Sequence, residues 1–240
     1  RARRQRAPHA DATEAGDAMR VLVGCEFSNT VAGAFRAAGH EAWSCDLLPS
    51  EGPTEWHMQR DVLDVLDEGW DLAVFHPPCT YLSVSGLHWN KRVKGRAEKT
   101  AEALCFVRQL LDAPIPKIAL ENPVSAISSQ IRKPDQVVQP WQFGHRESKA
   151  TCLWLKGLPR LRPTEVVAAS RLRCCGLALS PEVGARGCPN CNGDQLARPL
   201  WDNQTPSGQN KLSPGPNRWK ERSRTFKGIA EAMAAQWGTP

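Results

Sequence analysis

The chain has 240 residues, of which 41% are hydrophobic and 23% are charged, and its formal net charge is +6 at pH 7. This composition is that of an ordinary globular protein. No window approaches the roughly 18 apolar residues of a membrane span, and the N-terminus lacks the apolar core of a signal peptide. We therefore expect a cytoplasmic protein with no membrane partner, in which nine cysteines indicate catalysis or metal binding rather than disulfides.

Residues 1–18 begin with four arginines and show no periodicity, which predicts a disordered basic tail. Strands and helices then alternate. We expect strands at 19–27, 41–50, 71–75 and 116–120, helices at 30–40 and 96–113, and a mobile loop at 83–95. The alternation predicts an α/β fold with a doubly wound parallel sheet in residues 19–140. Residues 141–224 are irregular, basic and cysteine-rich, and a helix in 225–240 is expected to return to the core.

Two of the expected strands end in groups that can do chemistry. "DLAVF" runs through His76 and two prolines into Cys79, and "KIAL" runs into Glu121 and Asn122. The functional crevice of an open α/β sheet lies outside the carboxyl ends of its strands. A cysteine can also be an inert core thiol, which is what we expect of Cys25, Cys45 and Cys105. The second polar strand end favours a functional Cys79.

The order of the motifs resembles that of the DNA cytosine-5 methyltransferases, in particular the short bacteriophage forms. The resemblance extends over nearly the whole chain from Met19 and rests on "GCEFS", "SCDLLP", "HPPC" and "ENP", with "RSRTF" and "GIAEAMA" near the C-terminus. It implies a Rossmann-like methyltransferase sheet, S-adenosylmethionine as cofactor and double-stranded DNA as partner. Residues 19–140 would bind the cofactor, residues 141–224 would recognise the target, and a virus-encoded enzyme would work in the host cytoplasm.

The resemblance assigns the chemistry to three side chains. A Cys79 thiolate adds to C6 of a flipped cytosine, which makes C5 nucleophilic enough to take a methyl group, and the site must lower the pKa of this thiol. Glu121 meets N3 and the exocyclic amine. Lys149 stands where the family has an arginine that contacts the base carbonyl, although it is a point charge rather than a planar fork.

The remaining site residues follow from the same motifs. The expected cofactor-binding residues are Glu26, Phe27, Ser28, Asn29, Thr30, Asp46, Leu47, Asp61, Val62 and Pro77, with backbone amides of the first loop and the helix start facing the ligand. The expected substrate-binding residues are Pro78, Thr80, Ser83, Asn122, Arg146 and Thr151. The chain departs from the family at Thr80, where a glutamine is usual, and in its few glycines near the first loop.

The stretch "RCCGLALSPEVGARGCPNC" contains Cys174, Cys175, Cys188 and Cys191. The second pair has the spacing of a zinc knuckle, whereas the first is an adjacent Cys-Cys. We expect a structural zinc ion that stabilises the fold of the recognition region, with Cys152 or His145 as alternative ligands.

Two basic runs, at 146–173 and 211–227, predict a phosphate-binding surface. Trp89, Asn90, Trp201 and Trp219 are candidates for stacking on bases or filling the gap of a flipped one. The small recognition region predicts a target of two to four base pairs, and we expect a monomer.

Two alternatives stay open at this point. The first is related chemistry with RNA, a nucleotide or another donor, for which Lys91, Arg92 or Lys94 could hold a carboxylate. The second is a nucleic-acid-binding module that has lost catalysis.

Overall fold

The computed structural model describes residues 18–169, 171–172, 199–205 and 207–239. Its strands are β1 Arg20–Gly24, β2 Glu41–Asp46, β3 His57–Gln59, β4 Leu72–Phe75, β5 Lys117–Pro123, β6 Gln136–Val138, β7 Thr151–Lys156, β8 Arg171–Leu172 and β9 Pro199–Leu200. Its α-helices are α1 Thr30–Ala37, α2 Val84–Leu87, α3 Arg96–Leu111, α4 Ile127–Gln130, α6 Arg218–Ser223 and α7 Lys227–Trp237. Short 3-10 helices are η1 Thr54–Trp56, η2 Val62–Val65, η3 His88–Lys91 and η4 Pro140–Gln142.

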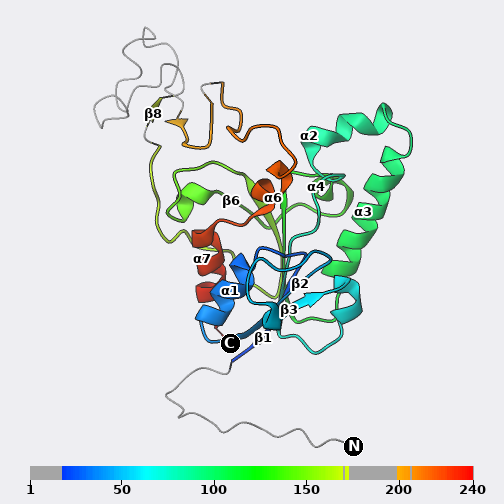
Figure 1. Cartoon of the computed structure of the whole chain (residues 1–240), viewed down its shortest axis with the longest axis vertical. Helices are drawn as coiled ribbons and strands as arrows, with labels where there is room; N and C mark the ends of the chain where they lie inside the picture. Colours follow the sequence, from blue (N-terminus) through cyan, green and yellow to red (C-terminus); the bar gives the residue numbers. More distant parts are fainter. Residues whose placement is uncertain (1–17, 170, 173–198, 206, 240) are drawn as a thin grey trace, which may run out of the picture.

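Seven strands form one mixed sheet in the order β3-β2-β1-β4-β5-β7-β6 (Figure 1). The strands β3, β2, β1, β4 and β5 run parallel, whereas β7 is antiparallel to both β5 and β6. The chain lays down β1 to β3 in one direction and then resumes with β4 on the other side of β1. The order therefore reverses between β1 and β4, which is where open α/β sheets place their ligand crevice. The predicted α/β, Rossmann-like fold is confirmed, but the prediction of an all-parallel sheet is wrong at β7.

The central strands are continuous apolar runs because both faces of the sheet are covered. All four residues of β4 are buried, as are the last four of β1. Gly24 ends β1 at a close approach, since a Cβ there would lie 2.6 Å from the Val62 side chain and 2.7 Å from the Phe75 ring. Only glycine fits this position without displacing its neighbours.

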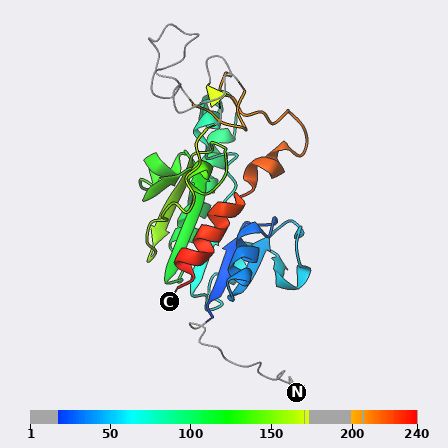
Figure 2. The same cartoon turned by 90° about the vertical axis from the view of Figure 1, so that its left-hand side faces the viewer.

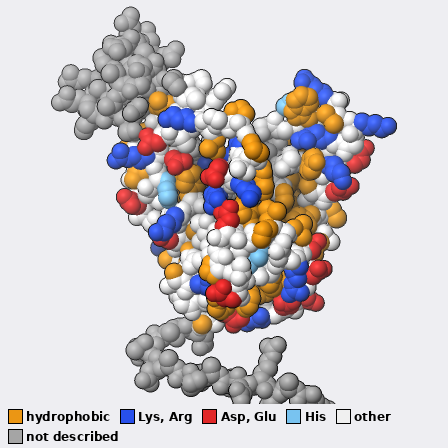
Figure 3. Space-filling view, viewed as in Figure 1, with side chains coloured by type: hydrophobic (Ala, Val, Ile, Leu, Met, Phe, Trp, Pro, Cys, Tyr) orange, Lys and Arg blue, Asp and Glu red, His pale blue; other side chains and the backbone are white. Residues whose placement is uncertain are grey.

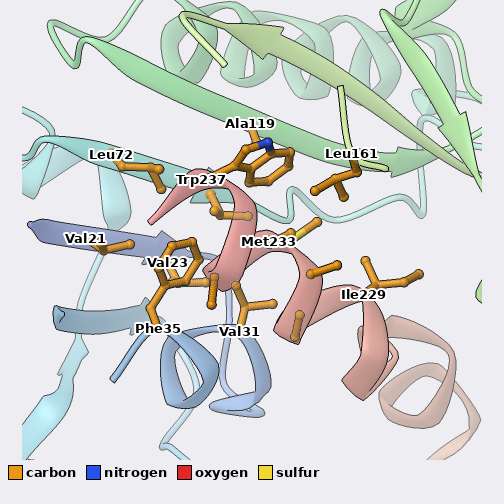
Figure 4. Close-up of a cluster of buried hydrophobic side chains, with 14 of the residues drawn as sticks. Val21, Val23, Val31, Phe35, Leu72, Ala119, Leu161, Ile229, Met233 and Trp237 are labelled. Carbon is orange, nitrogen blue, oxygen red and sulfur yellow. The ribbon is translucent and has the colours of Figure 1, made fainter. Parts of the chain in front are cut away.

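One face of the sheet is covered by α1 and α7, which lie side by side in Figures 1 and 2. In Figure 4, Ile229, Met233 and Trp237 extend from α7 among the side chains of α1 and the central strands. These three residues are almost fully buried in one hydrophobic cluster with Phe35 of α1. The C-terminal helix α7 thus completes the core of this face beside α1.

The opposite face is covered by α3, whose buried residues are Thr100, Leu104, Val107 and Leu110. Cys105, which we expected in the core, is exposed. It follows Leu104 directly and is therefore turned about 100° around the helix axis from the buried stripe. None of the helices in the described residues is long and apolar enough to cross a membrane.

The seven-stranded sheet extends beyond residue 140, because β7 pairs with β5 from Ile118–Lys156 to Pro123–Thr151. The domain boundary expected at residue 140 stays a prediction. Residues 83–95, expected as a mobile loop, contain the short helices α2 and η3.

Replacing Trp237 with alanine is expected to lower the free energy of unfolding by about 3–5 kcal/mol. The Trp237 side chain is 1% exposed, and its indole N–H donates to the Pro159 carbonyl at 2.9 Å. Chemical denaturation measures the change. Trp89→Ala is the control, because Trp89 is 45% exposed and should cost far less. Equal losses for the two variants would contradict this description of the core.

Candidate active site

Two adjoining cavities lie at the carboxyl ends of the parallel strands. The first, called the Cys79 cavity, has a volume of about 450 Å³ and contains Cys79 and Glu121 in its wall. The second, called the Asp61 cavity, has a volume of about 510 Å³. Both are lined by Cys25, Asp46, Pro77 and Pro78, so the two cavities are neighbours.

Cys79 lies at the end of β4, and the loop that carries it is held by the backbone. The amides of Leu82 and Ser83 donate to the Cys79 carbonyl at 3.1 and 2.9 Å. The Asn122 side-chain amide donates to the Pro77 carbonyl at 2.8 Å, which fixes this loop to the end of β5. Pro78, Thr80, Ser83 and Asn122, predicted as substrate-binding residues, all line the Cys79 cavity.

The pKa of the Cys79 thiol is raised in this site rather than lowered. Burial raises it most, and the negative charge of Glu121 raises it further. The positive charges of Arg222 and Lys149 act in the opposite direction. The expectation of a lowered pKa is therefore wrong for this arrangement of side chains, and formation of the thiolate depends on positive charge that reaches the cavity.

Glu121 is paired with His76 in the wall of the Cys79 cavity. His76 Nδ1 lies 3.0 Å from Glu121 Oε2, and both side chains are 9% exposed. Burial raises the pKa of the Glu121 carboxyl, but the hydrogen bond from His76 and the charges of Lys149 and His76 outweigh it, so the net shift is downward. His76 Nε2 is buried and has no hydrogen-bond partner among the described residues. Glu121 is thus a buried, oriented carboxylate.

Acidic residues stand at the end of β2 and shortly after β3. Asp46 lines both cavities, and burial raises the pKa of its carboxyl. Asp61 accepts a hydrogen bond from the Leu63 amide at 3.0 Å and lines the Asp61 cavity, together with Leu47 and Val62. The wall also contains the rings of Tyr81 and Phe106, so it combines flat apolar surface with carboxylates.

The first loop differs from the prediction. The Glu26 carboxylate accepts hydrogen bonds from the Val31 and Ala32 amides at 2.7 and 3.0 Å, so the start of α1 is occupied by the chain's own carboxylate. Phe27, Ser28 and Glu26 line the Cys79 cavity. Asn29 and Thr30 line neither cavity. Asn29 instead binds the Arg36 guanidinium, and the Thr30 hydroxyl lies 3.1 Å from that of Ser28.

Three predicted residues from the 141–224 range stand outside the cavities. Lys149 Nζ donates to the carbonyls of Arg222 and Arg224 at 2.9 and 3.1 Å. Thr151 is buried and its hydroxyl donates to the Lys149 carbonyl at 3.2 Å. Arg146 is exposed. In the described part of the chain, none of the three lines either cavity.

Sequence reasoning named Trp219 only as a candidate for stacking on bases and Arg222 only as part of a basic run. Both residues belong to α6 and line the Cys79 cavity, although they stand about 140 residues further along the chain than Cys79. The Trp219 ring lies 5.9 Å from that of Phe27, and Lys220 Nζ lies 5.7 Å from both rings. The density of arginine and lysine in 211–227 was the available signal, but it does not identify which cation faces Cys79.

The four cysteines predicted to bind zinc lie outside the described residues, so the expected zinc site, with Cys152 or His145 as alternative ligands, stays a prediction. Within the described ranges, no three His, Cys, Asp or Glu side chains form a group that could hold a metal ion. Lys91, Arg92 and Lys94, considered for a carboxylated donor, line neither cavity. They lie at the end of η3 and between η3 and α3. Basic side chains gather around these elements, at the upper right of Figure 3.

Searches of protein-family models and of curated proteins give no match. Among solved structures, the chain is similar to that of a candidate DNA modification methyltransferase encoded within an Escherichia coli prophage, with 14% sequence identity and a TM-score of 0.44. The similarity covers 63% of this chain and 53% of that one, so the chain spans about half the length of the protein it matches.

Proposed function

We propose that the protein is a DNA cytosine-5 methyltransferase that uses Cys79 as its nucleophile and S-adenosylmethionine as its methyl donor. The observation that carries the proposal is the presence of Cys79 and Glu121 in the wall of one cavity, at the ends of the neighbouring strands β4 and β5. The motif resemblance names these two residues independently of the geometry. The crevice between β1 and β4 is also where a doubly wound sheet binds its ligands.

The two side chains have complementary tasks. The Cys79 sulfur would form a bond to C6 of cytosine, which breaks the aromaticity of the ring and places electron density on C5. The Glu121 carboxylate would accept the exocyclic amine N–H and stabilise a proton on N3 as that density develops. His76 holds one carboxylate oxygen, Oε2, in place for this contact. A cavity of about 450 Å³ is large enough for a base taken out of the DNA stack.

The second cavity fits the proposed donor. S-adenosylmethionine would supply an electrophilic methyl group on a sulfonium centre. Asp46 stands 22 residues after Gly24, at the end of the second strand, where doubly wound folds place the acid that binds ribose hydroxyls. Asp61 can accept a hydrogen bond from an exocyclic amine, and Tyr81 and Phe106 offer flat surface to a purine. Double-stranded DNA is the proposed partner, and the basic residues beyond 141 its proposed contact surface.

The product of the reaction tests the proposal. The protein is incubated with S-adenosylmethionine and long duplex DNA that offers every short sequence context, and the DNA is then digested to nucleosides. Chromatography with mass spectrometry separates 5-methylcytosine from its N4-methyl isomer and from N6-methyladenine. We expect 5-methylcytosine. A methyl group on either exocyclic amine, or no modified base under conditions where the protein binds DNA, contradicts the proposal.

Replacing Asp46 with alanine is expected to weaken the binding of S-adenosylmethionine by roughly 10- to 100-fold, because a charged hydrogen bond from a half-buried carboxylate is lost. Isothermal titration calorimetry measures the dissociation constant. Asp112→Ala is the control, since Asp112 is exposed and follows the C-terminus of α3. Unchanged binding in the Asp46 variant would remove Asp46 from the donor site.

A further inference from the structure

The residue that the resemblance aligns with the family's arginine does not reach the active site. Lys149 Nζ donates to two carbonyls at the end of α6, those of Arg222 and Arg224, at 2.9 and 3.1 Å. Its ammonium also lies 5.9 Å from the Phe226 ring. Lys149 therefore binds the protein's own backbone and lines neither cavity among the described residues.

The segment that Lys149 holds carries a different cation into the Cys79 cavity. Residues 218–226, called the α6 segment, contribute Arg222 to the wall of the cavity that Cys79 also lines. In Figure 1, α6 lies at the upper edge of the sheet, above α7. Because arginine has a planar fork of donors and stays charged, it suits an oxygen or a sulfur anion better than lysine does.

Several contacts fix the α6 segment over the site. Arg224 forms an ion pair with Glu51 at 2.7 Å, which ties the segment to the loop after β2. Trp219 packs against Phe27 of the first loop. At the other end, the His145 ring lies 5.1 Å from that of Phe226. Together with the Lys149 hydrogen bonds, these contacts hold Arg222 at the cavity. The fold of the α6 segment therefore does not depend on a contact between Arg222 and Cys79.

We propose that Arg222 is the active-site cation that stabilises the Cys79 thiolate and faces the carbonyl of the target base, and that Lys149 is a positioning residue that holds the α6 segment in place. The proton lost by the thiol passes to solvent. This inference rests on the proposed nucleophilic role of Cys79. It reassigns to a distant segment the function that the motif alignment gave to Lys149.

The charges that face Cys79 come from several elements, and of the two cations Arg222 has the larger effect. The pKa of Cys79 is raised by burial and by Glu121, and it is lowered by Arg222 and then by Lys149. Other titratable groups in the same cavity wall are Cys25, Glu26, Asp46 and His76. Removing Arg222 would leave the Cys79 thiol facing carboxylates with less positive charge to oppose them, which disfavours the thiolate.

Alkylation of Cys79 by iodoacetamide tests the inference without DNA or donor, because only the thiolate reacts. The rate is followed for each cysteine by peptide mass spectrometry from pH 6.5 to 10. We expect Arg222→Gln to slow Cys79 alkylation at pH 8 by about three- to tenfold and Arg222→Lys to restore most of the rate. Exposed Cys105 is the internal reference and should not change. Arg218→Gln, on the same helix but outside the cavity wall, is the matched control.

The role of Lys149 is tested by a double-mutant cycle. If Lys149 acts by positioning Arg222, Lys149→Gln slows alkylation in the wild type but adds little to Arg222→Gln. Additive effects would show that Lys149 acts on the thiol directly and would overturn its positioning role. An unchanged Cys79 rate in Arg222→Gln would overturn the assignment of Arg222. Since alkylation needs no methylation, either result is independent of whether 5-methylcytosine is formed.

Discussion

Replacing Cys79 with alanine is expected to lower the formation of 5-methylcytosine by on the order of 10⁴-fold or more, because no other step can activate C5 once the nucleophile is absent. The side chain is small and exposed at the cavity, so its truncation should leave the fold unchanged. The measurement is the initial rate of methyl transfer to DNA from isotopically labelled S-adenosylmethionine.

Cys105→Ala is the matched control for this experiment. Cys105 is also an exposed cysteine, but it lies on α3 and lines neither cavity. We expect this variant to retain the wild-type rate. Substantial methylation by Cys79→Ala, or an equal loss in both variants, would show that the thiol of Cys79 is not the nucleophile.

The second large effect is expected at Glu121. Glu121→Gln keeps the size and shape of the side chain but removes its negative charge, and we expect methyl transfer to fall by roughly 10²- to 10⁴-fold. DNA binding, measured by fluorescence anisotropy, should change little, because phosphate contacts supply most of the affinity. The loss is therefore expected in kcat rather than in the binding of DNA.

The dependence of the protein's stability on pH gives a second measurement for Glu121. The pKa of this carboxyl lies below its ordinary value, chiefly because the hydrogen bond from His76 and the charge of Lys149 outweigh its burial. The anion is thus favoured in the folded protein, and the stability it contributes is present above the ordinary carboxyl pKa and lost as the pH falls through the lowered one.

The control for Glu121→Gln is Glu98→Gln, since Glu98 lies on α3 and lines neither cavity. A Glu121→Gln enzyme with wild-type kcat would remove Glu121 from the reaction.

The parts of the fold that could be predicted are those encoded by local periodicity. The apolar runs of β1, β4 and β5 and the amphipathic stripe of α3 were each recognised, and they suffice to bring Cys79 and Glu121 to one edge of the sheet. Strand β7 was missed. Its buried Cys152–Trp154 run is short, and periodicity alone cannot distinguish a short apolar run in a strand from one in another buried segment.

The parts of the site that could not be predicted depend on tertiary contacts. Nothing local in "RWKERS" distinguishes Arg222 from its basic neighbours, because its approach to Cys79 follows from the return of the chain through α6 into α7. Alignment of a short motif placed Lys149 in the site, but its side chain turns to the carbonyls of Arg222 and Arg224. Similarly, the role of Glu26 as the partner of the α1 amides depends on the turn at Asn29, whose φ is 58°.

The most direct test of the central claim is to trap the covalent bond between Cys79 and the base. The protein is incubated with S-adenosylmethionine and duplex DNA in which 5-fluorocytosine replaces cytosine. The fluorine occupies the place of the proton that must leave C5 before the sulfur can depart, so the adduct should persist. Peptide mass spectrometry then identifies the attached residue. We predict one protein–DNA adduct, at Cys79, that forms only with donor present. An adduct at another cysteine, or methylation of ordinary DNA with no adduct on the fluorinated DNA, would contradict the account.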